Sequence, residues 1–405
     1  MLAVRHLATH GWQPIVLTLD DASPGRVVEQ KWEGVRIIRV TPTSKGWRRA
    51  HRNYRRVHTS RGYRRLAWRL IGRCLCAHDR FAPAQADLIR VAEELNHSSR
   101  FRAVASQYHP VDSHHVGRAL AERWRVPWIA TTKDFFSWPD EQRPVSVTNR
   151  RNLRRRVLES RLLESADAVL SINDHMTTYL SGLVSGQPVA TWAHCFDDRT
   201  PAAPALSPPT RHATGPFHFV SVGLVDHHDE AGLISLFEAA RHVIDSGQLA
   251  SSALRLRFVG HGHEVVQRAA RLAELPEILQ LVPPVDHASA VSEMHRADCL
   301  LFQQVAWGSR RRLADYFGSG RPILAWPEYP QLSGVTSQPL LTRYGAAHLG
   351  GDTESLAQLL VQLVRSGHQD CPTVNLDLVE EFTSTTRGGE FASFLDNALL
   401  THRNF

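Results

Sequence analysis

Three arginines and an aspartate gather in the stretch GSRRRLAD, which runs from Gly308 to Asp315. An apolar strand candidate, residues 299–302, precedes it, and Ser309 is a residue type that caps helix N-termini. Backbone N–H groups at a helix N-terminus bind anions, and arginine binds phosphate oxygens in pairs. Arginines there oppose the helix dipole unless an anion lies beside them. We therefore predict a diphosphate site, with a solvated surface pair of Arg312 and Asp315 as the alternative.

Helix-length and strand-length apolar patterns alternate along the chain, which is typical of a parallel α/β protein. The predicted strands are residues 15–19, 35–40, 103–106, 128–131, 168–172, 217–222, 254–259, 278–282, 299–302 and 322–326. The predicted helices include residues 1–10, 119–124, 157–166, 233–244, 264–273, 288–296, 310–319 and 355–365. Two doubly wound domains in tandem are the simplest arrangement of these elements.

The size and composition of the chain fit two globular domains. Its 405 residues are 42% hydrophobic, and a proline-rich run at 199–216 predicts a linker. No apolar run approaches the about 20 residues of a membrane span, and no secretory signal is visible. Five scattered cysteines match no zinc spacing and favour a reducing compartment, so we expect a cytoplasmic protein.

The positive net charge of +7 comes from one basic segment, residues 34–78. This segment holds 12 arginines and one lysine but no aspartate or glutamate. Apolar residues recur at helical spacing from Tyr63 to Cys74, so we expect an amphipathic basic helix. We predict that residues 45–73 dock on an anionic membrane surface; a solvated face of a packed helix is the alternative. We expect no nucleic-acid partner, because nothing else in the chain suggests a nucleic-acid-binding module.

Several short motifs, taken in order, resemble nucleotide-sugar glycosyltransferases of the GT-B fold, most closely the family 4 enzymes of polysaccharide and glycolipid synthesis. In the second half the motifs are FVSVG (219–223), FVGHG (258–262), ADCLL (297–301), RLADY (312–316) and GRPIL (320–324). In the first half they are GWQPIVLT (11–18), SHHVG (113–117), VPWIA (126–130) and ESADAV (164–169). The similarity spans nearly the whole chain.

The resemblance implies a site for a nucleotide-sugar donor. Asp315 takes the place of the carboxylate that hydrogen-bonds the donor ribose, and Arg312 stands where many relatives carry a lysine. By the same resemblance Val282 and Val285 lie beside the base. The expected donor-binding residues are Gly223, Gly260, Gly262, Val282, Val285, Gly308, Ser309, Arg310, Arg312 and Asp315. The family usually transfers the sugar with retention and requires no metal or other cofactor.

Two residues of the first half are candidate catalytic groups. His115 and Asp134 fall where strand-end loops would face the cleft. His115 could steer donor or acceptor hydroxyls, and Asp134 could serve as a polar anchor or weak base. For His115 the alternative is an ordinary histidine, since the chain contains 23.

The resemblance also predicts the domain organisation: two Rossmann-like domains that face a cleft. Residues 1–198 would bind the acceptor, residues 217–376 would bind the nucleotide sugar, and residues 377–405 would pack back across the junction. The family has a strand and a glycine loop before the first helix, whereas this chain opens on MLAVRHLATHG. We therefore expect the natural protein to begin upstream of Met1, or this copy to be truncated and poorly active.

The predicted function is transfer of a sugar from a nucleotide diphosphate to a lipid-linked or polysaccharide acceptor of the cell envelope, by an enzyme peripheral on the inner face of the plasma membrane. Two departures from the family favour an alternative, a catalytically weakened or inactive GT-B partner or scaffold. Trp307 occupies the position of a family glutamate, and the loop 223–232 has three carboxylates and no permanent cation. That acidic loop could instead bind a divalent ion. A sugar-nucleotide epimerase is a third possibility.

Overall fold

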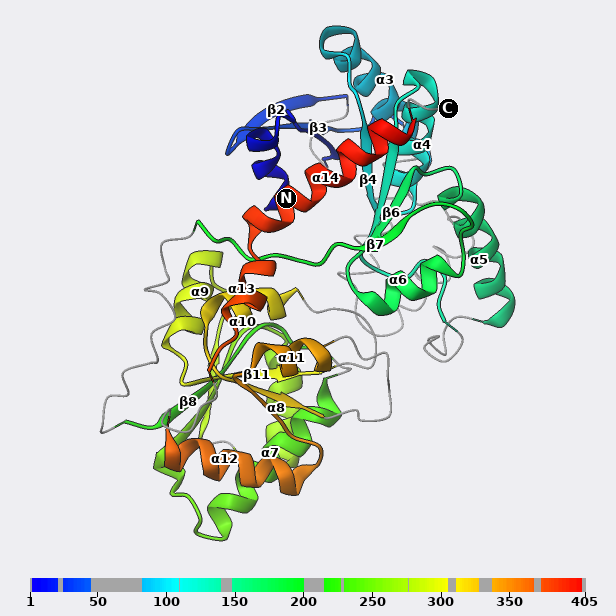
Figure 1. Ribbon diagram of the computed structural model, residues 1–405. Coiled ribbons are helices and arrows are strands. Elements are labelled where there is room, and N and C mark those ends of the chain that lie inside the picture. The colour runs from blue at the N-terminus through cyan, green and yellow to red at the C-terminus, as the bar shows by residue number, and fades with distance from the viewer. Residues whose placement is uncertain are drawn as a thin grey trace. The chain divides into compact units, whose positions relative to one another are not determined.

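The computed structural model forms two compact α/β units, shown in Figure 1. The N-terminal unit comprises Met1–Ala193 and Gly388–Phe405, and the C-terminal unit comprises His194–Arg387. The described residues are 2–20, 25–44, 82–108, 110–139, 148–199, 215–226, 229–275, 277–304, 311–327, 337–367 and 373–402. The predicted amphipathic basic helix, most of the predicted linker, Trp307 and the donor-site residues Gly308, Ser309 and Arg310 lie outside these residues.

The N-terminal unit begins with a three-stranded sheet. Helix η1 (Ala3–His10) is a 3-10 helix that Gly11 ends in a left-handed conformation with φ of 79°. The strands follow in the order β1-β3-β2, with β1 and β3 parallel and β2 antiparallel to β3. Their bounds are β1 (Ile15–Leu19), β2 (Val27–Trp32) and β3 (Val35–Val40).

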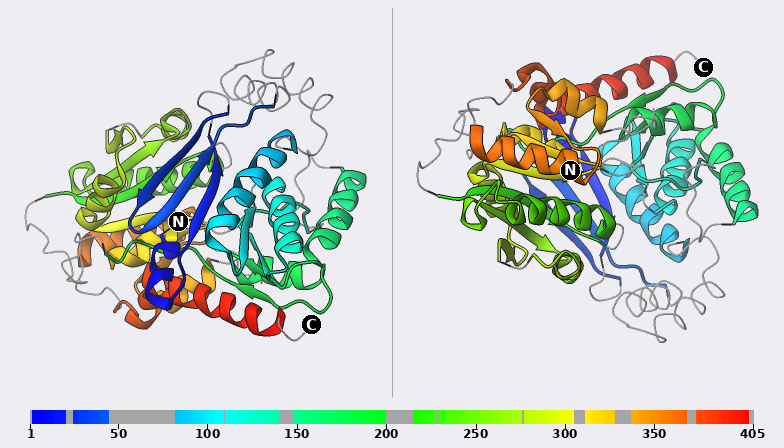
Figure 2. Two further views of the ribbon diagram at one scale, coloured as in Figure 1. Left: turned by 90° about the horizontal axis from the view of Figure 1, so that it is seen from above. Right: turned by 90° about the horizontal axis from the view of Figure 1, so that it is seen from below.

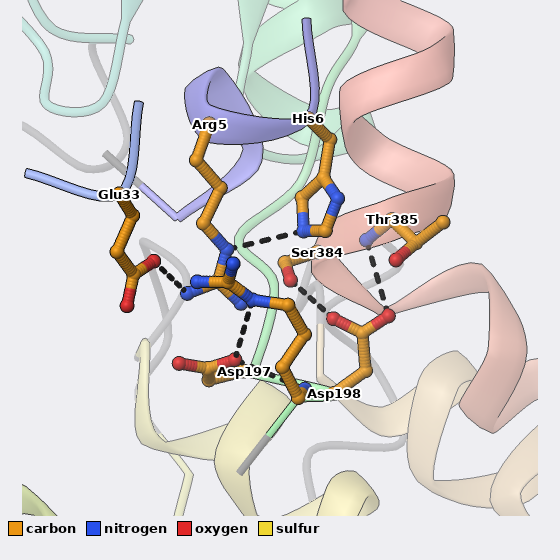
Figure 3. A network of polar contacts seen from close by, with 8 residues as sticks. Arg5, His6, Glu33, Asp197, Asp198, Ser384 and Thr385 are labelled. Atoms are coloured by element: carbon orange, nitrogen blue, oxygen red, sulfur yellow. Dashed lines mark hydrogen bonds and ion pairs between the residues drawn. The ribbon is translucent and has the colours of Figure 1, made fainter. Parts of the chain in front are cut away.

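A buried arginine ties η1 to this sheet. Arg5 is 6% exposed, and its Nη1 donates to Glu33 Oε2 at 2.9 Å in the turn between β2 and β3 (Figure 3). A charge this well buried is stable only when it is paired. The Arg5–Glu33 pair therefore fixes the chain start against the β2–β3 hairpin.

The second sheet of the N-terminal unit is fully parallel, in the order β4-β5-β6-β7. Its strands are β4 (Val104–Tyr108), β5 (Trp128–Thr132), β6 (Ala168–Ser171) and β7 (Val189–Thr191). The helices that accompany it are α3 (Ala82–Ser99), α4 (Asp112–Trp124), α5 (Asn149–Leu163) and α6 (Asp174–Ser181). All of β5 and β6 is buried, as expected for parallel strands covered on both faces.

Helix α14 (Ser384–His402) joins the N-terminal unit from Gly388 onward. Figures 1 and 2 show it running along the parallel sheet, with η1 beside it. Phe391 and Leu395 pack into one apolar cluster with Leu7 of η1 and Ile129 of β5. The end of the chain is therefore part of the core of the first unit.

The C-terminal unit contains a six-stranded parallel sheet in the order β10-β9-β8-β11-β12-β13. Its strands are β8 (Phe217–Leu224), β9 (Leu254–His261), β10 (Leu279–Val282), β11 (Cys299–Gln303), β12 (Ile323–Trp326) and β13 (Ala347–Leu349). In order of sequence this is 3-2-1-4-5-6, the doubly wound arrangement. Every strand predicted from the sequence is present in the two units, with its ends within two residues of the prediction.

Helices accompany this sheet along its length. They are α7 (Glu230–Asp245), α8 (His263–Leu272), α9 (His287–Arg296), α10 (Arg312–Ser319), α11 (Gln338–Tyr344), α12 (Thr353–Ser366) and α13 (Leu376–Glu381), with the short η3 (Ser251–Ala253). The largest apolar cluster joins α7, α8 and α12 to the strands through residues such as Phe237, Val266 and Leu360. This rigid core holds the strand ends in place.

An aspartate caps the beginning of α14 within the C-terminal unit. The Asp198 carboxylate accepts hydrogen bonds from Ser384 Oγ and, at 3.3 Å, from the Thr385 backbone N–H (Figure 3). Carboxylates stabilise helix N-termini because they satisfy free N–H groups and complement the dipole. The segment around Asp198, which follows the N-terminal unit in the sequence, is thus joined to the beginning of α14.

None of the helices in the described ranges has the length and apolar character needed to cross a bilayer.

Glycines allow the ends of β8 and β9 to approach each other. A Cβ added at Gly260 would overlap the carbonyl oxygen of Gly223, and one at Gly262 would overlap that of Val225. Both glycines also have positive φ, 136° and 90°. The backbone contact explains why no side chain fits at either position.

We predict that Gly260→Ala lowers the free energy of unfolding of the C-terminal unit by about 2–4 kcal/mol, because overpacking adds to backbone strain. Gly215→Ala is the matched control, because Gly215 has open space around its Cβ position and no positive φ; its effect should stay within about 0.5 kcal/mol. Urea unfolding followed by circular dichroism measures both. Equal midpoints for the two variants would contradict the packing argument.

Candidate functional site

The two innermost strands of the C-terminal sheet part at their carboxyl ends. β8 and β11 pair only where Cys299 and Leu300 meet Phe219 and Val220. Beyond this point the Tyr316 hydroxyl lies between the strands: it accepts from the Val222 N–H at 3.0 Å and donates to the Leu301 carbonyl at 3.2 Å. Doubly wound proteins bind ligands outside the strand ends at the place where the strand order reverses. The end of β8 and the beginning of α10 are therefore the candidate site.

Gly223 leaves the end of β8 open. It is exposed, its φ is 117°, and no atom lies within 4 Å of the position that a Cβ would occupy. Gly260 and Gly262 differ, since neighbouring backbone fills the corresponding space there. Of the predicted donor-site glycines that the structure describes, Gly223 is the one whose missing side chain leaves free room.

Arg312 binds the end of β8 directly. Its Nη2 donates to the Leu224 carbonyl oxygen at 2.6 Å, which ties the first residue of α10 to the strand end. As the structure describes it, the helix begins at Arg312 with Arg311 in the N-cap position. The predicted beginning at Arg310 and the predicted cap Ser309 lie outside the described residues.

Asp315 carries a half-buried carboxylate without a partner. Among the residues that the structure describes, none forms a hydrogen bond or ion pair with it. Burial raises the pKa of its carboxyl group; Arg311 and His287 nearby act in the opposite direction, and Asp197 acts with burial. A partly buried carboxylate that lacks internal donors is suited to accept hydrogen bonds from a ligand.

The predicted base-binding residues lie at the neighbouring edge of the same sheet. Val282 ends β10 and is half-buried, whereas Val285 is 41% exposed. Asp286 then caps α9, where its carboxylate accepts from the Ser289 N–H at 2.9 Å. Helices α9 and α10 contact each other, so the turn that carries Val285 and the helix that carries Asp315 are neighbours.

The acidic loop after β8 uses two of its carboxylates for internal contacts. The Asp229 carboxylate accepts from the Asp226 N–H at 2.9 Å, and Glu230 forms an ion pair with Arg268 of α8. In the described ranges no group of three or more His, Cys, Asp or Glu residues could hold a metal ion. The Asp229 and Glu230 carboxylates thus stabilise the beginning of α7.

The two predicted catalytic residues of the N-terminal unit are both exposed. Asp134 follows β5, and His115 lies in the first half of α4. The histidine beside it, His114, is buried: its Nδ1 and the Ser106 hydroxyl lie 2.8 Å apart, and Trp128 donates to the same hydroxyl. Burial lowers the pKa of His114 to about 3, so it is a neutral core residue.

A buried glutamate that the sequence reading did not single out holds the loop that carries Asp134. Glu159 of α5 accepts hydrogen bonds from both the N–H and the hydroxyl of Ser137, and that hydroxyl is 2.6 Å from the Tyr179 oxygen. Burial raises the pKa of Glu159 to about 7, although the bonds from Ser137 and the nearby Arg155 lower it. Helical spacing with Asn152, Leu162 and Leu163 could have indicated this inward position.

Comparison with known protein families finds a match in the N-terminal unit. Residues 1–191 match the family model described as "Glycosyl transferase 4-like domain". The N-terminal unit therefore resembles a glycosyl transferase 4-like domain. No curated protein matches the sequence of the chain.

Several solved structures share the fold along almost the whole chain. The α,α-trehalose 6-phosphate synthase of Burkholderia multivorans is 12% identical, with a TM-score of 0.63 over 96% of this chain and 92% of that one. The sucrose-phosphate synthase of Thermosynechococcus elongatus is 15% identical, with a TM-score of 0.56 over 99% and 90%. The α,α-trehalose-phosphate synthase (UDP-forming) of Burkholderia xenovorans, in complex with glucose-6-phosphate, is 10% identical, with a TM-score of 0.63 over 95% and 100%. The expected GT-B fold is confirmed.

We predict that Glu159→Gln removes a pH dependence from the stability of the protein. A folded-state pKa raised from the ordinary 4.5 to about 7 means that the native state holds a proton which the unfolded state releases. Wild-type stability then falls as the pH rises from 5 to 8, and the variant should gain about 3 kcal/mol relative to it over that range. Urea unfolding at several pH values measures the difference. The control is Glu164→Gln, an exposed carboxyl beside the same helix; if Glu159→Gln gives the same pH profile as this control, the buried proton is refuted.

Proposed function

We propose that the protein transfers a sugar from a nucleotide diphosphate donor, bound by the C-terminal unit, to an acceptor hydroxyl bound by the N-terminal unit. The observation that carries this proposal is the unpartnered Asp315 carboxylate at the strand-order reversal of a GT-B fold. A carboxylate there can accept hydrogen bonds from both hydroxyls of a ribose. One structural neighbour is a UDP-forming synthase, which supports a nucleoside diphosphate as the leaving group.

The roles of the remaining donor-site residues follow from their positions. The open backbone at Gly223 allows a phosphate to come close, and Val282 and Val285 offer an apolar surface for the base. Arg312, together with Gly308, Ser309 and Arg310, would stabilise the negative charge that develops on the departing diphosphate. We propose that no metal ion or other cofactor is required, since arginines can supply this positive charge.

The acceptor and the stereochemistry are further parts of the proposal. We propose retention, and a lipid-linked or polysaccharide acceptor at the inner face of the plasma membrane, from the resemblance to family 4 enzymes; scattered cysteines support a cytoplasmic site. His115 and Asp134 are exposed and available to acceptor hydroxyls. The names of the structural neighbours favour a second candidate, a sugar phosphate, which a panel of acceptors would separate from the first.

A catalytically weakened partner protein is the rival function. The observation in its favour is that Arg312, a predicted diphosphate ligand, donates to the chain's own Leu224 carbonyl. Donor hydrolysis and sugar transfer distinguish the two functions. A weakened protein would bind nucleoside diphosphates normally. It would neither hydrolyse the donor without an acceptor nor transfer the sugar when an acceptor is present.

We predict that Asp315→Ala weakens binding of the preferred nucleoside diphosphate at least about tenfold, because each hydrogen bond to a charged group contributes about 1.5–3 kcal/mol. Isothermal titration with UDP, ADP and GDP measures the affinity. Glu238→Ala is the matched control, an exposed carboxylate of α7 in the same unit, and should bind as the wild type does. Tight binding that Asp315→Ala leaves unchanged would place the donor elsewhere, and absence of binding by the wild type would refute the donor site.

A further inference from the structure

The outer side of α5 combines arginines with large aliphatic side chains in one stripe. Leu153, Val157 and Leu158 are 60%, 44% and 49% exposed, which is high for residues of this size. Arg150, Arg154 and Arg161 are exposed among them. The six positions follow i, i+3, i+4, i+7, i+8, i+11 spacing, so they share one helix face, which we call the α5 stripe.

The opposite face of α5 is well packed. Asn152, Glu159, Leu162 and Leu163 are buried against the rest of the unit. Figures 1 and 2 show α5 at the periphery of this unit, with no other described helix or strand over its outer side. The stripe is therefore a surface of a firmly held helix.

The positive charge of the stripe is uncompensated. In the described part of the chain, Arg150, Arg154 and Arg161 make no hydrogen bond and no ion pair. Arg155 and Arg156, by contrast, donate inward to the carbonyls of Phe136 and Trp138. Glu159, the one acidic residue of α5, is buried and bound to Ser137. Glu164, directly after the end of α5, forms no ion pair with Arg161, and three arginines that no described residue pairs with favour an anionic partner.

The aliphatic side chains between the arginines indicate which class of anionic partner fits the α5 stripe. Single-stranded nucleic acid is bound through aromatic side chains on which bases stack, and the α5 stripe contains none. The surface of an anionic bilayer offers phosphate groups to the arginines and acyl chains to the aliphatic side chains. Long arginine side chains can reach the headgroups while neighbouring residues insert beneath them.

We propose that the α5 stripe is a docking surface for an anionic phospholipid bilayer. It is distinct from the basic segment 34–78. Docking here would attach the enzyme of the proposed function to a membrane. It does not depend on the donor site. α5 would lie parallel to the membrane with Leu153, Val157 and Leu158 inserted.

Vesicle sedimentation tests the proposal with the full chain. Vesicles of phosphatidylcholine and phosphatidylglycerol at 70:30 are compared with pure phosphatidylcholine in about 0.1 M salt, where surface charges still act. Two triple variants remove one component each: Arg150→Gln with Arg154→Gln and Arg161→Gln, and Leu153→Ser with Val157→Ser and Leu158→Ser. We expect each to lower binding to the anionic vesicles at least tenfold.

Matched controls make equal changes elsewhere on the surface. Arg90→Gln with Arg118→Gln and Arg123→Gln removes the same charge from exposed arginines of α3 and α4. Leu272→Ser with Leu376→Ser and Leu400→Ser removes comparable exposed leucines. Both controls should bind the anionic vesicles within twofold of the wild type.

Three results would overturn the proposal. The first is binding of either α5 variant within twofold of the wild type, which would leave attachment to another segment. The second is equal wild-type binding to neutral vesicles. The third is a dimer in light scattering that the α5 variants abolish, which would assign the stripe to a second copy of the chain. Titration with nucleoside diphosphates reports the donor site separately, so failure of one proposal is distinguishable from failure of the other.

Discussion

The Tyr316 hydroxyl binds backbone groups that would be left unpaired where β8 and β11 part in the C-terminal sheet. Parallel strands that part expose backbone groups in a buried place, where an unpaired group costs about 1–3 kcal/mol. Tyr316 is fully buried and satisfies one such group from each strand, the Val222 N–H and the Leu301 carbonyl. Because one side chain bridges both strands, they can diverge and leave room at their ends without losing the core beneath.

The same bridge positions the ribose-binding candidate. Arg312 and Tyr316 lie three residues before and one residue after Asp315, so the three side chains leave neighbouring sides of α10. Arg312 holds the Leu224 carbonyl and Tyr316 holds the strands, which anchors the helix on both sides of Asp315. The carboxylate is thereby held rigidly while no described residue binds it, and rigidity of this kind lowers the entropic cost of binding a ligand.

Sequence reading found the buried parallel strands because they are continuous apolar runs. It missed β2, whose residues are mostly exposed, and β7 and β13, which have three residues each. It placed Asp315 at the strand ends through the RLADY motif. Periodicity alone did not separate His114 from His115, since that distinction depends on Ser106 and Trp128, which lie elsewhere in the chain. Glu159 was hidden among the six arginines of α5 for the same reason.

The arginines of α5 differ in whether hydrogen-bond acceptors lie within reach of their guanidinium groups. A guanidinium group can be buried only where hydrogen-bond acceptors are present. In the loop after β5, the carbonyls of Phe136 and Trp138 accept from Arg155 and Arg156. Among the described residues none accepts from Arg150, Arg154 or Arg161, which are exposed beside exposed aliphatic residues. One helix thus fixes the loop that carries Asp134 from within and presents a cationic surface outward. Any ligand of that surface would meet a helix already held in place by its contacts with the loop after β5.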